Sequence, residues 1–340
     1  MSNHGGDVYR NRVDIDFSVN VNPLGIPEAV CAALHGAVET CGQYPDMEAG
    51  ELRRAVSDYF SVPKGNLLFG NGASELFMAL AHGIRPGKTV VPVPSFYGYE
   101  YAAQAVGSKI LFYELKQENS FCVTGDLYSV LTEDVDLLFL ANPNNPTGRC
   151  MDREMVFDIL RHCREKGIYV VLDESFITFC GIQRSMLSAA EEFDNLILIR
   201  SFTKSFSIPG VRLGCLVCYN PLLLKRAAEQ LPEWNLSCFA QAAGCACIKQ
   251  AAFLEKTMTY TKRERYFLTE GLRKAGFQVF SSDANFILFY SEEPLYERLL
   301  KKGILIRDCS SFRGLGRGFY RVAVKNREEN EILLKELSFF

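Results

Sequence analysis

The sequence has little of what marks several large classes of protein. Its formal net charge of −3 leaves no basic surface for nucleic acid or for an anionic membrane. Its four histidines are few for a metal centre, and we expect no metal. No apolar run approaches the roughly twenty residues that a membrane span needs. The first twelve residues are polar and contain glycine, so they fit neither a signal peptide nor a transit peptide.

Cysteine, by contrast, is plentiful, with twelve among 340 residues. Without a secretion signal, these cysteines predict free thiols in a reducing cytoplasm and not a disulfide framework. Cys215 and Cys218 have the spacing of a zinc ligand pair, but in a strand positions three apart face opposite sides. The segment GIRPGKT, residues 83–89, is one residue short of a P-loop and leads into a strand instead of a helix. Neither motif predicts a site.

Short apolar runs recur along the first two thirds of the chain. They lie at residues 67–69, 89–93, 109–113, 136–140, 168–172, 195–199 and 214–218. Helix-like segments such as 74–83 and 152–166 separate most of them. This alternation predicts an α/β fold with a largely parallel sheet covered on both faces.

The pattern changes after about residue 237. Residues 237–275 are long and helical, which is typical of a connector between domains. Short strands and helices follow, at residues 285–289, 294–301, 304–306, 319–324 and 328–337, and predict a small α+β domain. We therefore expect a large domain over residues 41–275, including the connector helix, and a small domain over 276–340. Residues 1–40 are expected to pack against the small domain.

Two reactive side chains stand at the ends of strand-like runs. In SFTKSFSIPGVRLGC, residues 201–215, Lys204 follows an apolar run and is surrounded by hydroxyl side chains. A solvated lysine in a turn would give this pattern, and so would a lysine held in a pocket to react with a carbonyl group. Asp173 ends the buried run in IYVVLDESF. At that end of a parallel strand it faces the crevice where such sheets bind ligands, and burial demands a cationic partner.

Two turns lie at the same predicted edge of the sheet. FGNGASEL, residues 69–76, is typical of strand, glycine turn and helix. The backbone N–H groups at such a helix start, with the Ser74 hydroxyl, favour a phosphate. The turn ANPNNPTGR, residues 141–149, contributes Asn145 as a side-chain donor. A phosphate cradle, a carboxylate and a lysine together indicate a phosphorylated cofactor with a basic ring nitrogen and an aldehyde, and pyridoxal 5′-phosphate (PLP) has all three.

These segments resemble the motifs of fold-type-I PLP enzymes, the class I/II aminotransferase superfamily. SFTKSFSIPGVRLG, NPNNPTG and DESF match in the right order, and the match covers nearly the whole chain. The resemblance implies a fold-type-I PLP transferase with a large, mostly parallel-sheet domain and a small α+β domain. It also implies PLP as the cofactor.

The resemblance gives each matching residue a role. Lys204 and Asp173 would be the catalytic residues: the lysine would form an imine with the cofactor and carry a proton, and the aspartate would keep the pyridine nitrogen protonated. Asn145 would donate to the phenolic oxygen of the ring. Phe96 would stack on the ring, although a core phenylalanine gives the same pattern. The cofactor phosphate would be bound by Gly72, Ala73, Ser74, Ser201 and Arg212.

Three further positions bear on assembly and chemistry. Tyr44, in QYPD, matches a tyrosine that reaches the cofactor phosphate of the other subunit, so the resemblance implies a homodimer with shared sites. Arg321, in FYRVAVK, matches the arginine that binds the substrate carboxylate with both arms of its guanidinium. Most aminotransferases of the superfamily have a tyrosine where this chain has Phe176. The ring therefore loses one donor, which weakens the case for ordinary transamination.

Outside the shared motifs, NHGGDVYR, IDFSVNVNPLGIP and ILIRDCSSFRGLGRGFYRVAVK look most like the L-threonine-O-3-phosphate decarboxylases of the cobalamin pathway. Similar decarboxylases also have a phenylalanine at the position of Phe176. In that family threonine phosphate loses carbon dioxide and gives (R)-1-amino-2-propanol O-2-phosphate. A phosphorylated substrate needs a second anion site, with Arg307 as the first candidate and Asn22 and His4 as further ones. The alternative for Arg307 is an ordinary surface arginine, and the alternative for His4 is a chain terminus without a role.

Other functions stay open at this point. Histidinol-phosphate aminotransferase is the alternative in fold and motif, and its substrate also carries a phosphate. Serine phosphate differs from threonine phosphate by one methyl group, worth only about 1–3 kcal/mol in a pocket. The fold also serves as a non-catalytic PLP-binding effector module in some transcription regulators, but this chain shows no DNA-binding module. We expect a cytoplasmic, homodimeric enzyme, a carboxy-lyase acting on a small phosphorylated amino acid, with no nucleic-acid or membrane partner.

Overall fold

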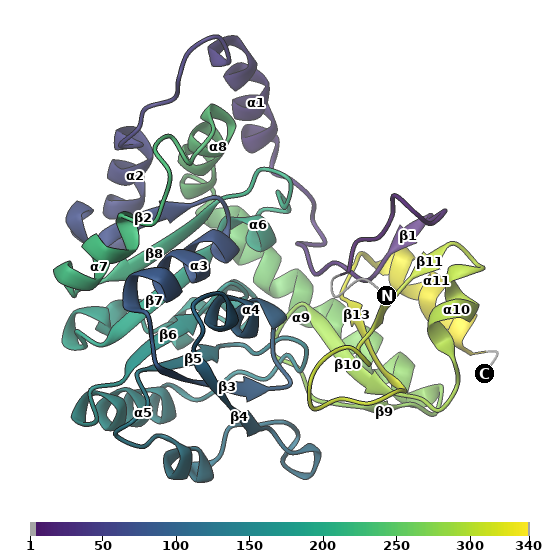
Figure 1. The fold of residues 1–340 in the computed structure, drawn as a ribbon. Coiled ribbons are helices and arrows are strands. Elements are labelled where there is room, and N and C mark those ends of the chain that lie inside the picture. Colours follow the sequence, from purple (N-terminus) through teal and green to yellow (C-terminus); the bar gives the residue numbers. More distant parts are fainter. Residues whose placement is uncertain (1–4, 339–340) are drawn as a thin grey trace.

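The computed structural model describes residues 5–338, which form two groups of strands joined by a long helix (Figure 1). The larger sheet has seven strands. Their order is β2 (Leu67–Gly70), β8 (Gly214–Cys218), β7 (Leu196–Ser201), β6 (Tyr169–Asp173), β5 (Leu137–Ala141), β3 (Lys88–Val93) and β4 (Lys109–Glu114). Of these strands, β8 alone runs in the direction opposite to the other six. The predicted α/β fold with a mostly parallel sheet is therefore confirmed.

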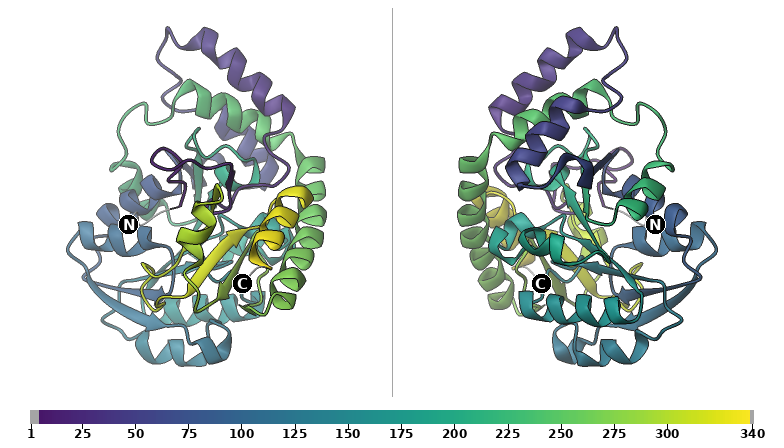
Figure 2. Two further views of the ribbon diagram at one scale, coloured as in Figure 1. Left: turned by 90° about the vertical axis from the view of Figure 1, so that its right-hand side faces the viewer. Right: turned by 90° about the vertical axis from the view of Figure 1, so that its left-hand side faces the viewer.

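Helices cover both faces of this sheet (Figure 2). One face packs against α3 (Ala73–Ile84), α4 (Tyr97–Ala105) and α7 (Pro221–Ala228). The other packs against α2 (Gly50–Phe60), α5 (Arg153–Glu165) and α8 (Cys238–Ile248). Because both faces are buried, the central strands are apolar throughout, which is why their positions could be predicted from apolar runs.

The two misleading motifs lie where the sequence analysis placed them. Cys215 and Cys218 both belong to β8, and their side chains enter the apolar cores on opposite faces of the sheet. The P-loop-like segment is the turn between α3 and β3. Short 3₁₀ helices occupy other connections, at Val38–Thr40, Lys64–Asn66, Gln117–Asn119, Gly125–Val130, Ile177–Phe179, Ile182–Arg184 and Leu187–Glu192.

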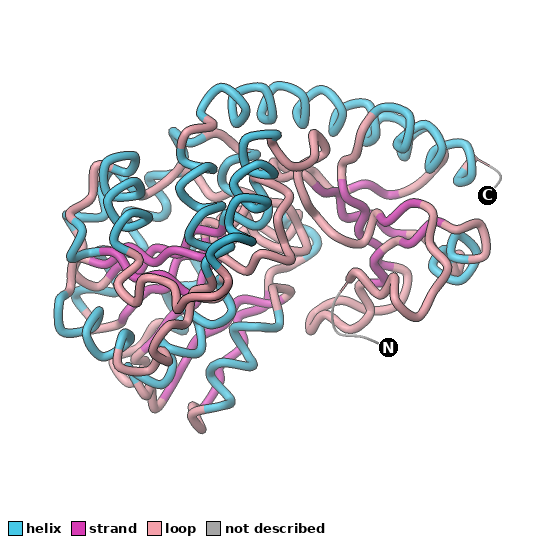
Figure 3. Tube along the Cα trace, turned by 90° about the horizontal axis from the view of Figure 1, so that it is seen from above, coloured by secondary structure: helices cyan, strands magenta, loops and turns pink. Residues whose placement is uncertain are grey.

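The second group of strands forms the carboxyl-terminal sheet, which is antiparallel. Its order is β12 (Arg307–Asp308), β13 (Phe319–Ala323), β10 (Phe286–Tyr290) and β9 (Gln278–Val279). The long helix α9 (Ala251–Lys274) leads into it and packs against α11 (Arg327–Leu337), as the view from above shows (Figure 3). The remaining helix of this part is α10 (Leu295–Leu300).

The amino-terminal segment contacts both parts of the molecule. Its strand β1 (Ile15–Asp16) pairs in parallel with β11 (Ile304–Leu305), beside the carboxyl-terminal sheet. Helix α1 (Glu28–Ala37) packs instead against α8 of the large part. This segment therefore connects the two groups of strands a second time, in addition to α9.

Within residues 5–338, no helix combines the length and apolarity needed to cross a membrane. The same residues contain no cluster of three or more side chains suited to a metal ion. All twelve cysteines lie in this range as free thiols.

Candidate active site

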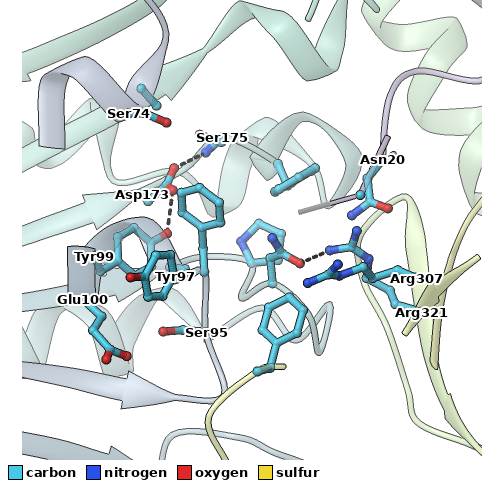
Figure 4. Close-up of a pocket in the computed structure, with 18 of the residues that line it drawn as sticks. Asn20, Ser74, Ser95, Tyr97, Tyr99, Glu100, Asp173, Ser175, Arg307 and Arg321 are labelled. Carbon is cyan, nitrogen blue, oxygen red and sulfur yellow. Dashed lines mark hydrogen bonds between the residues drawn. The ribbon is translucent and has the colours of Figure 1, made fainter. Parts of the chain in front are cut away.

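A cavity of about 590 Å³ lies between the large sheet, the carboxyl-terminal sheet and the amino-terminal segment (Figure 4). It opens at the carboxyl ends of β5, β6 and β7, where parallel strands of α/β proteins bind ligands. Most of the predicted site residues line it. These are Ala73, Ser74, Phe96, Asn145, Asp173, Ser201, Lys204, Arg212, Arg307 and Arg321.

Asp173 is the last residue of β6 and is almost fully buried. Its carboxylate accepts a hydrogen bond from the Tyr99 hydroxyl at 2.6 Å and one from the Ser175 backbone N–H at 2.9 Å. Burial raises the pKa of Asp173, whereas the bonds from Ser175 and Tyr99 and the charge of Lys204 act to lower it. The carboxylate is thus fixed in orientation at the cavity wall, and a cation on the ligand would complete its environment.

Tyr99 was not predicted as a site residue. It lies on α4, one helical turn beyond Phe96, and its ring contacts those of Phe96 and Phe139 at centroid distances of 5.7 and 5.2 Å. Burial, and then the charge of Asp173, raise the pKa of Tyr99 well above its usual value. Tyr99 is therefore a neutral hydrogen-bond donor to Asp173. Its spacing from Phe96 was the available signal, because residues three apart share a helix face.

Lys204 lies in the one-turn helix α6 (Phe202–Ser205), directly after β7. Burial, reinforced by the charges of Arg321 and Arg212, lowers the pKa of Lys204 to about 8. About a tenth of this amine is consequently uncharged at pH 7, and the share rises to about half at pH 8, whereas an exposed lysine is almost wholly protonated. Uncharged amine is the form that attacks a carbonyl carbon.

Asn22, a predicted substrate residue, lies outside the cavity. Its backbone N–H donates to the Lys204 carbonyl at 3.0 Å, and its amide donates to the Ser205 carbonyl and to Thr257, both at 2.7 Å. Asn22 thus holds the turn that carries the lysine. Asn20, which the sequence analysis did not single out, lines the cavity instead, and its buried Oδ1 has no hydrogen-bond partner among residues 5–338.

The start of α3 forms a concave corner of the cavity. No side chain within residues 5–338 caps this helix, and Gly72, at its N-cap position, has a φ of 85°. A Cβ at Gly72 would lie 2.4 Å from Nη2 of Arg212, so only glycine allows this arginine to lie against the turn. Arg212 donates to the Asn71 carbonyl at 3.4 Å. Ser74 and Ser201 add hydroxyl groups beside it. An uncapped helix start beside an arginine suits a phosphate group.

Arg321 and Arg307 occupy the opposite wall, across from Asp173 (Figure 4). They are directly opposite each other on the neighbouring strands β13 and β12, so their side chains share one face. Arg321 donates to Asn145 Oδ1 and, at 2.8 Å, to the Ser18 carbonyl. Its buried Nε has no partner among residues 5–338. Burial lowers the pKa of Arg321 to about 10, and the charge of Arg307 adds to this effect.

Arg307 is itself 7% exposed and donates to the Ser311 hydroxyl at 2.9 Å. Burial lowers its pKa as well. Two buried guanidinium groups side by side repel each other, and ligand anions would offset that cost. This wall is therefore suited to a ligand with two anionic groups.

Besides Asn22, two predicted residues of the described part, Gly72 and Tyr44, are not part of this cavity wall. Gly72 lies behind it, against Arg212. Tyr44 is 82% exposed and packs on Trp234, with ring centroids 4.9 Å apart. His4 lies outside the described residues. Phe176 does line the cavity, beside Phe286, with centroids 5.1 Å apart.

Comparison with known proteins agrees with this architecture. The family model for aminotransferase class I and II matches residues 12–337. A protein of Caldanaerobacter subterraneus subsp. tengcongensis, provisionally named a threonine-phosphate decarboxylase, is 36% identical over 98% of this chain and 92% of its own. The threonine-phosphate decarboxylase of Salmonella typhimurium is 32% identical over 95% of this chain and 90% of its own.

Among solved structures, the histidinol-phosphate aminotransferase of Clostridium acetobutylicum superposes with a TM-score of 0.89. It is 33% identical in sequence, and the superposition covers 96% of this chain and 98% of that one. The family match and these full-length similarities lead to one assignment. The chain belongs to the aminotransferase class I and II family.

Proposed function

We propose that this protein is a PLP-dependent decarboxylase that converts L-threonine O-3-phosphate to (R)-1-amino-2-propanol O-2-phosphate, a step of cobalamin biosynthesis. The observation that carries the proposal is the pair of buried arginines, Arg307 and Arg321, which face the cavity that holds Lys204 and Asp173. Threonine phosphate has two anionic groups to match them. The similar proteins of Caldanaerobacter and Salmonella carry the name of the same activity.

The cavity has the chemistry that PLP requires. The corner formed by Ser74, Ser201 and Arg212, with Gly72 behind it, would hold its phosphate. Asp173, a buried carboxylate with two neutral donors, would accept a bond from the protonated ring nitrogen. Lys204 would hold the cofactor covalently, and Phe96 and Asn145 would flank the ring. When bound, PLP supplies an aldehyde that joins the substrate's amine and a ring that takes up the electrons left by the departing group.

The protein's own residues then decide which bond is broken. Arg321, whose Nε has no partner among the described residues, would bind the carboxylate, and Arg307 would bind the substrate's phosphate at the other end. Anchoring both ends of the substrate fixes the rotation about the bond between its nitrogen and Cα. This rotation places the carboxylate in the position from which it can leave. Tyr99 acts on Asp173 by holding its carboxylate in place. Lys204, whose pKa is lowered to about 8, can accept and return a proton near neutral pH.

A histidinol-phosphate aminotransferase is the second candidate, because the Clostridium enzyme of that name has a TM-score of 0.89 with this chain. Two features favour the decarboxylase. Histidinol phosphate has one anionic group, whereas the cavity wall offers two buried arginines. In addition, Phe176 lacks the hydroxyl that most aminotransferases of the superfamily present to the ring.

Incubating the PLP-loaded protein with each phosphorylated substrate separates the two functions. We expect carbon dioxide and a phosphorylated amino alcohol from threonine phosphate without any 2-oxo acid, both measured by mass spectrometry. Histidinol phosphate with 2-oxoglutarate should give no keto product. Serine phosphate, assayed in parallel, measures how strongly the enzyme prefers the substrate with the methyl group. We expect its kcat/KM to be lower by about ten- to two-hundredfold at most. Amino transfer from histidinol phosphate with no carbon dioxide from threonine phosphate would contradict the proposal.

We also infer that the protein is a homodimer with shared sites. Tyr44 is 82% exposed and lies away from the cavity of its own chain, so its predicted phosphate contact requires a second chain. Mixing a Tyr44→Phe chain with a Lys204→Ala chain should restore activity, because each mixed dimer then has one site with both native residues. Tyr44→Phe alone should bind PLP more weakly, by roughly tenfold for one hydrogen bond to a charged group. Light scattering that shows a fully active monomer would refute this.

A further inference from the structure

The loop between β12 and β13, residues 309–318, reaches from the carboxyl-terminal sheet to the rim of the large sheet. Its Arg313 donates from Nε and Nη2 to the two carboxylate oxygens of Glu100 on α4, at 3.2 and 2.8 Å. The guanidinium also lies 4.1 Å from the centroid of the Phe112 ring. Gly314 follows, close enough to the large sheet that a Cβ there would lie 3.3 Å from the Pro94 nitrogen. We call the contact of Arg313 with Glu100 the clasp.

The same loop supports Arg307. Ser311, two residues before Arg313, accepts the hydrogen bond from Arg307 Nη2 at 2.9 Å. The ring of Phe312 lies 5.4 Å from the Arg307 guanidinium. Ser311, Phe312 and Arg307 all line the cavity. The position of the loop therefore helps to determine where the Arg307 guanidinium points. The clasp fixes that position by holding the loop to α4 of the large part, across the cavity from the carboxyl-terminal sheet.

Glu100 gives the clasp a second effect. Its side chain is only 11% exposed and lines the cavity, so its charge needs compensation. Arg313 supplies a cation, and Gln104 adds one neutral hydrogen bond at 3.0 Å. Without Arg313, a negative charge would stand uncompensated in the wall of a cavity suited to anions. Such a charge repels an anionic ligand.

We propose that the clasp determines specificity for the phosphorylated end of the substrate, with Arg313 and Glu100 as positioning residues that act through Arg307. This inference rests on the proposed function, since it assumes that Arg307 binds the substrate's phosphate. Arg313→Ala would displace Arg307 without removing it, so a bound substrate would still be anchored at both ends. The weakened contact is made in the ground state and persists through the reaction, so KM should rise while kcat stays nearly unchanged.

Steady-state kinetics of Arg313→Ala with threonine phosphate test the inference. We expect KM to rise about tenfold, the size of one charge-assisted hydrogen bond, with kcat and PLP content at wild-type values. Arg313→Lys keeps the positive charge but loses the bidentate contact with Glu100. Its KM should therefore lie between those of the wild-type protein and Arg313→Ala. The matched control is Arg317→Ala, which removes an exposed arginine from the same loop and should leave KM unchanged.

A KM for Arg313→Ala equal to that of Arg317→Ala would overturn the inference. So would a loss of thermal stability and of kcat at constant KM, because that result would make the clasp structural only. Failure of the proposed function gives a different result, since the wild-type protein itself would then release no carbon dioxide. In that case, titrating the PLP-loaded variants with threonine phosphate and following cofactor absorbance still tests the clasp through binding alone.

Discussion

Lys204→Ala is expected to abolish covalent retention of PLP and to reduce decarboxylation by at least about 10⁴-fold, the upper range for removing a positioned proton-transfer group. The physical reason is that Lys204 lies in α6, directly after β7, and lines the cavity, where burial and two arginines lower its pKa to about 8. Treatment with borohydride followed by peptide mass spectrometry should find PLP on the peptide containing Lys204 in the wild-type protein, and on no peptide of the variant.

Lys225→Ala, which changes an exposed lysine on α7, is the matched control and should retain PLP at the wild-type level. The pH dependence gives a second readout. In the apoprotein, the rate of PLP capture should rise as pH passes through about 8, because the reactive amine loses its proton there. A midpoint near the ordinary lysine value, or an adduct that persists in Lys204→Ala, would show that another amine holds the cofactor.

Arg307→Ala is expected to lower kcat/KM for threonine phosphate by roughly 10²- to 10³-fold, the range for removing one partner of a buried charge pair. Arg307 is 7% exposed, so no solvent cation can readily replace it beside a phosphate. In the wild-type protein, plain threonine should be a poorer substrate by roughly 10⁴-fold, since it lacks the phosphate group that this guanidinium would bind. The variant should lose most of that preference.

The comparison of two substrates makes this result specific. If Arg307 binds the phosphate, its removal should affect threonine phosphate far more than threonine. An equal loss with both substrates would instead place Arg307 near the carboxylate or the cofactor. Arg317→Ala again serves as the control, because Arg317 is exposed on the neighbouring loop and lies outside the cavity.

Much of this arrangement could be predicted from the sequence because it depends on local patterns. The strands of a doubly covered sheet are continuous apolar runs, so their carboxyl ends, and with them Asp173 and Lys204, could be located. The helix start at Ala73 was also predictable, because a glycine turn after a strand has a recognisable composition.

The contacts that depend on distant parts of the chain could not be predicted in this way. The pairing of Arg307 with Arg321 follows from the register of β12 and β13, which no local pattern specifies. Asn20 lines the cavity in place of the predicted Asn22, and this depends on the path of the amino-terminal segment after β1. The bond from Tyr99 to Asp173 joins residues 74 apart in the chain. Each is a property of tertiary packing, so each became visible only in the structure.

The course of the amino-terminal segment has a practical consequence for engineering the protein. Gly5 lines the cavity, and a Cβ there would lie 2.4 Å from the Ser18 carbonyl oxygen, the same atom that accepts the bond from Arg321. A side chain at position 5 would therefore displace the carbonyl group that orients Arg321. Helix α11, by contrast, contributes no residue to the cavity wall. Labels and reporter substitutions are therefore better placed on α11, where measured constants still describe the unaltered site.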